Sequence, residues 1–435
     1  MTGTPIRDLV GIGIGPFNLG LACLSDPLDL DELFLDERNA FEFHRGVMLE
    51  GSTIQVPFLA DLVSLADPTS RFSFLNWLKH TDRLYPFYIR ESFYPLRAEY
   101  EAYCRWACEQ LDTLRWGRRV VAVEHDETAD CYIVRAELAD GTVEEHRARH
   151  VVVGIGSEPY VPPALARVAE HVVHSASFLP EQGAIESAGS VAVIGSGQSA
   201  AEIYRTLLDS MDEAGFRLDW ITRAPRFFPM EYTKLTLEMT SPDYTDYFHA
   251  LPLTTRDRLS REHRGLYKGI SSDLINDIYD TLYRKSVVKD VPTTLLTETE
   301  VVDARWDTQA GVVELTLENR QAGARFVRTA ASVVLATGYR QRPPTFLDPV
   351  RERLAWDERG RLAVARNYAI DQGRGRVFVQ NGEEHTHGLT APDLGFGCWR
   401  NASVLASVLG FEPYHVERRI AFQDFGAPVM MEGRS

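Results

Sequence analysis

The chain has 435 residues, 44% of them hydrophobic, which is enough for two or three domains with cores of their own. A formal net charge of −16 argues against a general surface for nucleic acid or for anionic membranes, but leaves room for a local basic pocket. The five cysteines are scattered, with no CxxC pair and no metal-site spacing, which predicts reduced thiols and no bound metal. We find no targeting segment and no apolar run near ~20 residues, so we expect a cytoplasmic protein.

The N-terminal segment predicts a strand, a glycine-rich turn and a helix. An apolar run over 9–14 indicates a buried parallel strand, and 16–24 is typical of the helix that follows. Gly13 would allow the tight turn, and Gly15 would let a pyrophosphate approach the backbone. The helix that opens at Pro16 would offer free N–H groups and the positive end of its dipole to the phosphates. The alternative is a glycine turn that serves packing alone.

An acidic residue at the expected distance supports a dinucleotide site at this first turn. A strand over 33–35 ends at Asp36, with Glu37 beside it, and an acid at this place binds ribose hydroxyls. Asn18 stands where the usual pattern has its third glycine, and we expect it next to the cofactor.

The region between this turn and residue 163 predicts two helices, a hairpin and a closing strand. A crossover rich in glycine and proline then leaves the first domain over 154–163. The helices are expected at 70–79 and 96–111, and the strands at 120–123, 131–137 and 150–154.

A second glycine-rich turn begins about 180 residues after the first. The strand expected over 190–194 leads into Gly195 and Gly197, and a helix opens at Gln198 and Ser199. Two such turns suggest two bound dinucleotides, which is typical of a protein that passes electrons between them.

Arginines replace the acid at this second turn. The next strand, over 219–223, ends at Arg223, and Arg226 follows closely. A guanidinium binds a ribose 2′-phosphate that a carboxylate would repel, so the second site is predicted to hold NADPH and the first FAD. The alternative is that both arginines are solvated surface charges.

The remaining elements bring the chain back to the first domain. A helix over 273–283, strands over 331–338 and 376–381 and a helix from 403 are predicted, and the turn at Gly338 and Tyr339 is the expected return to the flavin. The fold class is therefore α/β, with two Rossmann-like domains, the NADPH domain inserted in the FAD domain, and a small mainly helical substrate region. We expect an FAD-binding domain over 1–160 and 331–384, an NADPH-binding domain over 161–238 and 285–330, and a substrate-binding region over 239–284 and 385–435.

Seven motifs make the chain similar to a known family. It resembles the bacterial N-hydroxylating flavin monooxygenases of siderophore biosynthesis, which include the lysine and ornithine hydroxylases. The motifs are GIGPFNL at 13–19, FEFH at 41–44, QVPFLADL at 55–62, PLRAEY at 95–100, GSGQSA at 195–200, ATGY at 336–339 and HGL at 387–389.

This resemblance implies a mechanism and a set of cofactor contacts. NADPH reduces FAD, oxygen adds to form a flavin hydroperoxide, and a neutral amine of the substrate attacks it while NADP⁺ stays bound. The enzyme then needs a dry pocket and a placed amine, and no nucleophile of its own. The resemblance places His44 and Gln55 near the flavin and Arg97 near the flavin and the nicotinamide, and it implies a homo-oligomer. Taken alone, His44 is typical of a core histidine.

Departures from the amino-acid hydroxylases indicate the substrate. Where those enzymes carry a lysine and an asparagine that hold the amino-acid head, this chain has Ala60 and Leu237. A buried carboxylate would lose its ion pair there at a cost of several kcal/mol. The segment from 385 to 401 resembles that of putrescine and cadaverine hydroxylases, so Asp393 and Gly395 are expected at the pocket, with Asp393 either holding a distal ammonium or capping a helix.

The sequence therefore predicts an FAD- and NADPH-dependent N-monooxygenase of a diamine, cadaverine or putrescine, for hydroxamate siderophore biosynthesis. Its expected partners are the small diamine and O₂. The alternatives are an L-lysine side-chain N-monooxygenase, and an NADPH oxidase or flavin-binding regulatory relative without amine chemistry. Leu266 stands where the family tends to place an asparagine that contacts the nicotinamide ribose, so that contact is in doubt.

Overall fold

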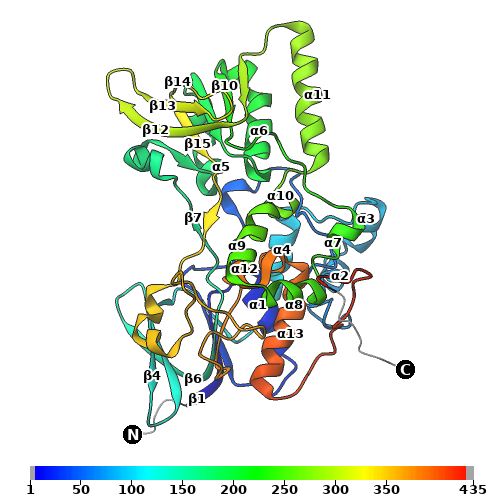
Figure 1. The fold of residues 1–435 in the computed structure, drawn as a ribbon. Helices are drawn as coiled ribbons and strands as arrows, with labels where there is room; N and C mark the ends of the chain where they lie inside the picture. The colour runs from blue at the N-terminus through cyan, green and yellow to red at the C-terminus, as the bar shows by residue number, and fades with distance from the viewer. Residues whose placement is uncertain (1–4, 428–435) are drawn as a thin grey trace, which may run out of the picture.

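The structure is a computed structural model that describes residues 5–427, and two sheets form its two halves (Figure 1). The first sheet has the order β3-β2-β1-β6-β5-β4. β6 pairs antiparallel with β5 along its first half, and parallel with β17 at its end. Its strands are β1 (Ile6–Ile12), β2 (Glu32–Leu35), β3 (Leu114–Arg115), β4 (Arg119–Asp126), β5 (Cys131–Glu137), β6 (Val143–Val153) and β17 (Val377–Val379).

The second sheet has the order β11-β10-β9-β15-β8 and is parallel throughout. An antiparallel sheet of β12, β13 and β14 packs beside it, with Val313, Leu315 and Leu317 of the middle strand buried at every second position. The strands are β8 (Val173–His174), β9 (Ser190–Ile194), β10 (Arg217–Ile221), β11 (Thr293–Leu296), β12 (Thr299–Asp307), β13 (Val312–Asn319), β14 (Ala324–Ala330) and β15 (Ser332–Leu335).

Helices cover both sheets and fill the waist between the two halves (Figure 1). α1 (Pro16–Ser25), α4 (Arg97–Cys108) and α13 (Gly395–Leu409) share one core with the first sheet, while α6 (Gln198–Ala214) and α11 (Ser272–Val288) share another with the second. The other α-helices are α2 (Phe74–His80), α3 (Leu84–Ile89), α5 (Phe178–Glu186), α7 (Lys234–Leu237), α8 (Pro242–Ala250), α9 (Leu253–Glu262), α10 (Arg264–Tyr267) and α12 (Glu384–His387). Short 3-10 helices are η1 (Arg45–Val47), η2 (Pro163–His171), η3 (Ser175–Ser177), η4 (Thr345–Arg353) and η5 (Gly388–Thr390).

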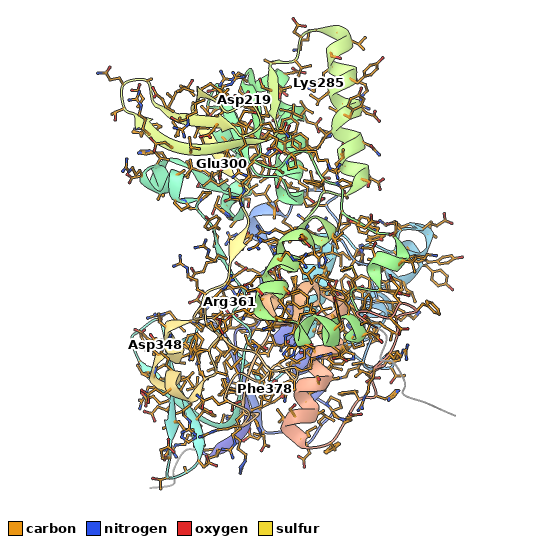
Figure 2. All side chains as sticks on the ribbon, in the orientation of Figure 1. Asp219, Lys285, Glu300, Asp348, Arg361 and Phe378 are labelled. Atoms are coloured by element: carbon orange, nitrogen blue, oxygen red, sulfur yellow. The ribbon has the colours of Figure 1, made fainter. Side chains whose placement is uncertain are left out.

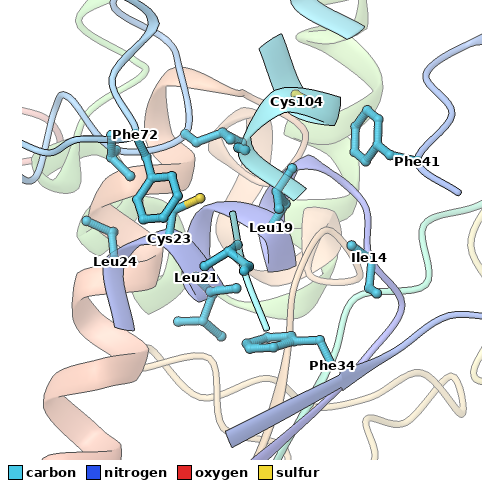
Figure 3. Packing of buried hydrophobic residues seen from close by; sticks show 14 of the residues in the cluster. Ile14, Leu19, Leu21, Cys23, Leu24, Phe34, Phe41, Phe72 and Cys104 are labelled. Carbon is cyan, nitrogen blue, oxygen red and sulfur yellow. The ribbon is translucent and has the colours of Figure 1, made fainter. Parts of the chain in front are cut away.

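The core around α1 explains why that helix is apolar on nearly every side. Leu19, Leu21 and Leu24 are fully buried between the sheet, α4 and α13, and Phe34 of β2 lies below them (Figure 3). A helix enclosed in this way has no solvated face to fill with charges. This packing places the N-terminal end of α1 at the carboxyl ends of β1 and β6.

Two crossover segments join the halves as a short ribbon. The chain leaves the first half through β7 (Glu158–Pro159) and returns through β16 (Tyr339–Arg340), and these two strands pair antiparallel (Figure 1). Across residues 5–427, no helix combines the length and the apolar surface that a membrane crossing requires.

The predicted fold class is confirmed, with three local corrections. β15 was expected in the first domain but pairs in parallel with β9, so the return begins only after Leu335. The whole of α11 packs with the second half, not with the substrate region, because its apolar face contacts α6. The last helix begins at Gly395 rather than 403, and its glycine-rich start fits because a Cβ on Gly397 would lie 3.2 Å from the Phe17 ring. The expected segments 1–4 and 428–435 lie outside the described residues.

Candidate functional site

The two glycines of the first turn have different structural roles. Gly13 has φ +90°, and a Cβ there would lie 2.5 Å from the carbonyl oxygen of Gly154, so only glycine lets these backbones meet. Gly15 has φ −90°, and a Cβ there would meet nothing within 4 Å. Its open face precedes the free N–H groups of α1, which begins at Pro16, and this is the cradle that a pyrophosphate fits.

The buried side chain of Asn18 stabilises this turn through hydrogen bonds to its backbone. Its side chain is fully buried, and Nδ2 donates to the carbonyl oxygens of Gly13 (2.8 Å) and Ile12 (3.2 Å). Its Oδ1 accepts from Nε2 of Gln380 at 2.7 Å. Asn18 therefore shapes the cradle through the backbone, and its direct contact with a cofactor stays a prediction.

Asp36 is also engaged by the protein. Its Oδ2 accepts from the backbone N–H of Ile14 (2.7 Å), and both oxygens accept from the Arg38 guanidinium at 2.7 and 2.9 Å. Burial raises the pKa of this carboxyl, but the bonds and charge of Arg38 outweigh it and hold the pKa below its usual value. Asp36 is therefore a carboxylate that fixes the turn. Its contact with the ribose stays a prediction, and its neighbour Glu37 is exposed.

Two residues expected near the flavin carry unusual features. His44 has φ +47° and stacks edge-on against Phe43 with centroids 4.4 Å apart. Desolvation by the surrounding protein, followed by the charge of Arg97, lowers the pKa of His44, although part of the residue reaches the surface. Nε2 of Gln55 is buried and donates to no described residue. An unpaired buried donor is costly, and an acceptor on a bound flavin ring would satisfy it.

Arg97 ties the two halves of the molecule together. Its two terminal nitrogens each donate to one carboxylate oxygen of Glu202 at 2.8 Å, and Nη1 also donates to the carbonyl oxygen of Val47 at 2.8 Å. Arg97 begins α4, Glu202 lies on α6, and both are buried. Paired guanidinium and carboxylate groups of this geometry are among the stronger polar contacts.

The second turn repeats the close approach of the first. Gly195 has φ +155°, and a Cβ there would lie 2.2 Å from the carbonyl oxygen of Ala336. Gln198, expected at the cofactor, donates to Glu202 and accepts from the backbone N–H of Ser271, both at 2.8 Å. Gly197 precedes α6, and Ser199 is half-buried in the first turn of the helix.

The two arginines predicted to bind a 2′-phosphate lie in the loop after β10, and that contact stays a prediction. Arg223 and Arg226 directly follow β10 and are exposed. Arg223 is 3.7 Å from Glu300, which is labelled in Figure 2, and Arg226 covers the Phe228 ring at 4.6 Å. These weak contacts leave both guanidinium groups open to a phosphate.

Three of the expected substrate residues lie together. A Cβ on Gly395 would lie 3.5 Å from Cβ of Ala60 and 3.1 Å from Oδ1 of Asp393. Oδ1 of Asp393 accepts from the backbone N–H of Phe396 at 2.8 Å, so the capping interpretation is correct for this oxygen. Desolvation raises the pKa of Asp393 above its usual value. The Phe396 N–H and the charge of Arg400 lower this pKa, but their effect is smaller. Leu237 lies on α7 with 48% of its surface exposed, and its part in the pocket stays a prediction.

The crossover and the waist hold further contacts. The carbonyl oxygen of Gly338 accepts from the backbone N–H of Tyr160 at 2.9 Å, and Tyr339 meets His174 edge-on at 5.3 Å. Nζ of Lys268 lies 3.0 Å from Glu384 of α12. The sequence interpretation included neither Glu202 nor Glu384. Glu202 follows Gln198 by one helical turn, but its partner Arg97 lies 105 residues away.

A cleft opens beside the carboxyl ends of β6 and β17, where ligands bind in open α/β sheets. Its volume is about 290 Å³, and it reaches from Ile155 and Asn381 to Asp257 of α9. Arg361, labelled in Figure 2, lines it and donates to Asp257 at 2.9 Å. The cleft lies next to the return crossover, with Gln341 and Pro343 in its lining.

Comparisons with known proteins agree with this fold. A family model described as L-lysine 6-monooxygenase/L-ornithine 5-monooxygenase matches residues 5–341. A putrescine N-hydroxylase from Shewanella oneidensis is 47% identical over 422 residues, which is 97% of this chain and 84% of that protein. The crystal structure of a cadaverine monooxygenase from Erwinia amylovora, of the desferrioxamine pathway and bound to FAD, is 48% identical with a TM-score of 0.96, over 98% of this chain and 100% of that one. An ornithine N-hydroxylase from Kutzneria, with reduced FAD, NADP⁺ and L-ornithine, is 28% identical with a TM-score of 0.86, over 93% and 99%.

The two glycines of the first turn should separate folding from cofactor binding. Gly15→Val adds a side chain where the protein leaves space, so we expect normal far-UV circular dichroism but at least tenfold less bound flavin absorbance per polypeptide. Gly13→Val forces a Cβ onto the Gly154 carbonyl, so we expect loss of soluble folded protein. Full flavin content in Gly15→Val would contradict the cradle.

Removing the charge of Glu202 should weaken the link between the halves. Glu202→Gln leaves Arg97 buried without a carboxylate, which costs about 3–5 kcal/mol, and we expect a lower midpoint of thermal unfolding by calorimetry. Glu213→Gln removes the same charge from an exposed position of the same helix and should leave the midpoint unchanged. Equal midpoints for the two variants would show that the pair contributes nothing to stability.

Proposed function

The chain belongs to the L-lysine 6-monooxygenase/L-ornithine 5-monooxygenase family, and from this premise we propose that it hydroxylates one terminal amine of a diamine. The substrate is putrescine or cadaverine, the co-substrates are NADPH and O₂, the cofactor is FAD, and the product serves hydroxamate siderophore biosynthesis. The observation that carries the proposal is that Ala60, which has no charge, and the carboxyl group of Asp393 both lie next to Gly395.

The relatives support a diamine over an amino acid. The proteins named for putrescine and cadaverine are 47% and 48% identical to this chain, whereas the ornithine enzyme is 28% identical. An α-carboxylate needs a cation or several donors when it leaves water. Ala60 supplies none, and a diamine has no carboxylate to satisfy.

The residues of the chain bind and orient both dinucleotides. Bound FAD supplies the chemistry that takes electrons from NADPH and delivers one oxygen atom of O₂ to the amine nitrogen. The N-terminal end of α1 would hold its pyrophosphate, and the unpaired amide of Gln55 would donate to its ring. Arg223 and Arg226 hold the 2′-phosphate of NADPH.

Asp393 orients the diamine by its far end. Oδ1 keeps the Phe396 N–H, and Oδ2 accepts from the distal ammonium, which in turn favours the charged form of the carboxyl. The reacting amine must be neutral to act as a nucleophile. Holding only the distal nitrogen as an ammonium leaves the near nitrogen free to lose its proton in the dry pocket next to the flavin.

The remaining assignments complete the proposal. The FAD domain is formed by the first sheet with its helices, and the NADPH domain by the second sheet together with α11. The protein acts on a small amine and O₂ as a homo-oligomer. Its location in the cytoplasm stays the prediction made from the sequence.

A substrate panel tests the function directly. We expect hydroxylamine formation that depends on O₂ and NADPH with putrescine or cadaverine, and at least tenfold lower kcat/KM with L-lysine and L-ornithine. Hydroxylated product is measured separately from hydrogen peroxide. Equal turnover of lysine would support the lysine N-monooxygenase, and peroxide alone with every amine would support the oxidase.

The Asp393→Asn variant tests the distal anchor without losing the cap. Asparagine still accepts from the Phe396 N–H but has no charge, and losing a charge-assisted bond of about 1.5–3 kcal/mol should raise the diamine KM about 10- to 100-fold. A monoamine of the same length has no distal ammonium, so its KM should not change. An unchanged diamine KM would leave Asp393 with the capping role alone.

The pH dependence gives a second measurement of the same anchor. As pH falls through the raised pKa of Asp393, its carboxyl becomes neutral, and the diamine KM of the unmodified protein should rise. The Asn variant should lack this acid limb. An identical limb in both proteins would assign the titration to another group.

A further inference from the structure

Residues 420–425, here called the strap, run past α8 and reach α7 near the C-terminal end of the chain (Figure 1). α7 is a helix of four residues, none of which is buried, and no side chain caps its N-terminal end. A helix this short has little stability of its own. Among residues 5–427, the hydrogen bonds that join α7 and the adjoining Glu238 to distant parts of the chain all come from the strap.

Four hydrogen bonds join the strap to α7 and Glu238. The backbone N–H groups of Phe422 and Gln423 donate to the two carboxylate oxygens of Glu238 at 2.9 and 3.1 Å. Nε2 of Gln423 donates to the carbonyl oxygen of Leu235 at 2.6 Å and to Glu238 at 2.9 Å. The Phe422 N–H, and then the Gln423 side chain, lower the pKa of Glu238. The strap thus occupies an end of α7 whose carbonyl groups have no helical partner.

The strap is also fixed to α8. Oδ2 of Asp243, in the first turn of α8, accepts from the backbone N–H groups of Ile420 (2.9 Å) and Ala421 (3.3 Å). The Phe425 ring meets the Tyr244 ring edge-on with their centroids 4.9 Å apart. One short segment therefore holds two neighbouring helices together.

A cavity of about 320 Å³ lies between α7, α8, α9 and the strap. Leu235 and Met239 line it together with Leu259 of α9, and Gln423 and Phe425 of the strap complete the lining. Space of this kind leaves α7 without close-packed contacts there. The strap, rather than a packed core, therefore sets the position of α7.

α8 connects the strap to the expected diamine site. Oγ1 of Thr245 on α8 and Oγ1 of Thr390 are hydrogen-bonded at 3.1 Å, and both residues are buried. Thr390 ends η5, which leads directly to Asp393. The chain that precedes the strap is held by α13, because Nε1 of Trp399 donates to the carbonyl oxygen of Glu417 at 2.9 Å. The strap is thus attached to elements on both sides of Asp393.

We propose that the strap positions the substrate region around the diamine, with Gln423 and Phe425 as positioning residues. The inference rests on the proposed function. Through α7 the strap fixes Leu237, and through α8 and η5 it fixes the carboxyl group of Asp393 that orients the far ammonium. The hydrogen bonds of the strap with described residues reach neither glycine-rich turn, so binding of the dinucleotides does not depend on it.

Kinetics of the FAD-loaded full chain test this role. Gln423→Ala removes two of the bonds to α7 and Glu238, and Phe425→Ala removes the ring that meets Tyr244. Each variant should raise the diamine KM about 3- to 10-fold, while kcat and the KM for NADPH stay within about twofold. Hydrogen exchange followed by mass spectrometry should become about tenfold faster over 233–239 and stay unchanged over α1 and α6.

Matched controls lie outside the strap. Gln309→Ala and Phe411→Ala remove the same groups from exposed positions and should leave the diamine KM and the exchange unchanged. Phe425→Tyr keeps the ring and should keep the diamine KM.

Three results would contradict the positioning role. An unchanged diamine KM in both alanine variants of a protein that hydroxylates diamines would overturn the role of the strap alone. Faster exchange over 233–239 with an unchanged KM would do so as well, because the strap would then serve stability only. The absence of diamine hydroxylation in the unmodified protein would overturn the proposed function, and this role with it.

Discussion

The close approach of two pairs of backbones is the constraint on which the rest of the structure depends. Gly13 lies against Gly154, where the chain leaves the first domain, and Gly195 lies against Ala336, where it returns. In both cases a Cβ would collide with a carbonyl oxygen, at 2.5 and 2.2 Å. Each dinucleotide turn is thus fixed to one crossover segment, and the crossovers pair with each other as β7 and β16. The positions of the two cofactor sites are coupled through this ribbon.

Charged contacts add a second connection between the two halves. The pair of Arg97 and Glu202 joins α4 to α6, and Gln198 extends it to Ser271 before α11. Arg97 belongs to a motif expected at the cofactors, yet its side chain joins the two halves. A residue next to a cofactor motif therefore contributes by holding the two halves in register, so that a hydride donor and a flavin could meet in a fixed geometry.

The substrate pocket shows how one residue serves two needs. Oδ1 of Asp393 satisfies an N–H at the start of α13, which any polar cap would do, while the carboxyl places negative charge beside Ala60. The same acid would repel the carboxylate of an amino acid. Under the proposed function, specificity for a diamine would arise from an absent cation and a present anion together.

The sequence by itself determined both glycine turns, the α/β class and the family, because strand, turn and helix signals are local and the motifs are contiguous. It also determined that arginines, and not an acid, follow the strand that comes after the second glycine turn. Only the tertiary structure decided that β15 joins the second sheet, that Asn18 is bound by Gln380, and that Arg97 meets Glu202. Those partners lie up to 362 residues apart. Periodicity and spacing carry no information about such pairs, because chain topology alone brings them together.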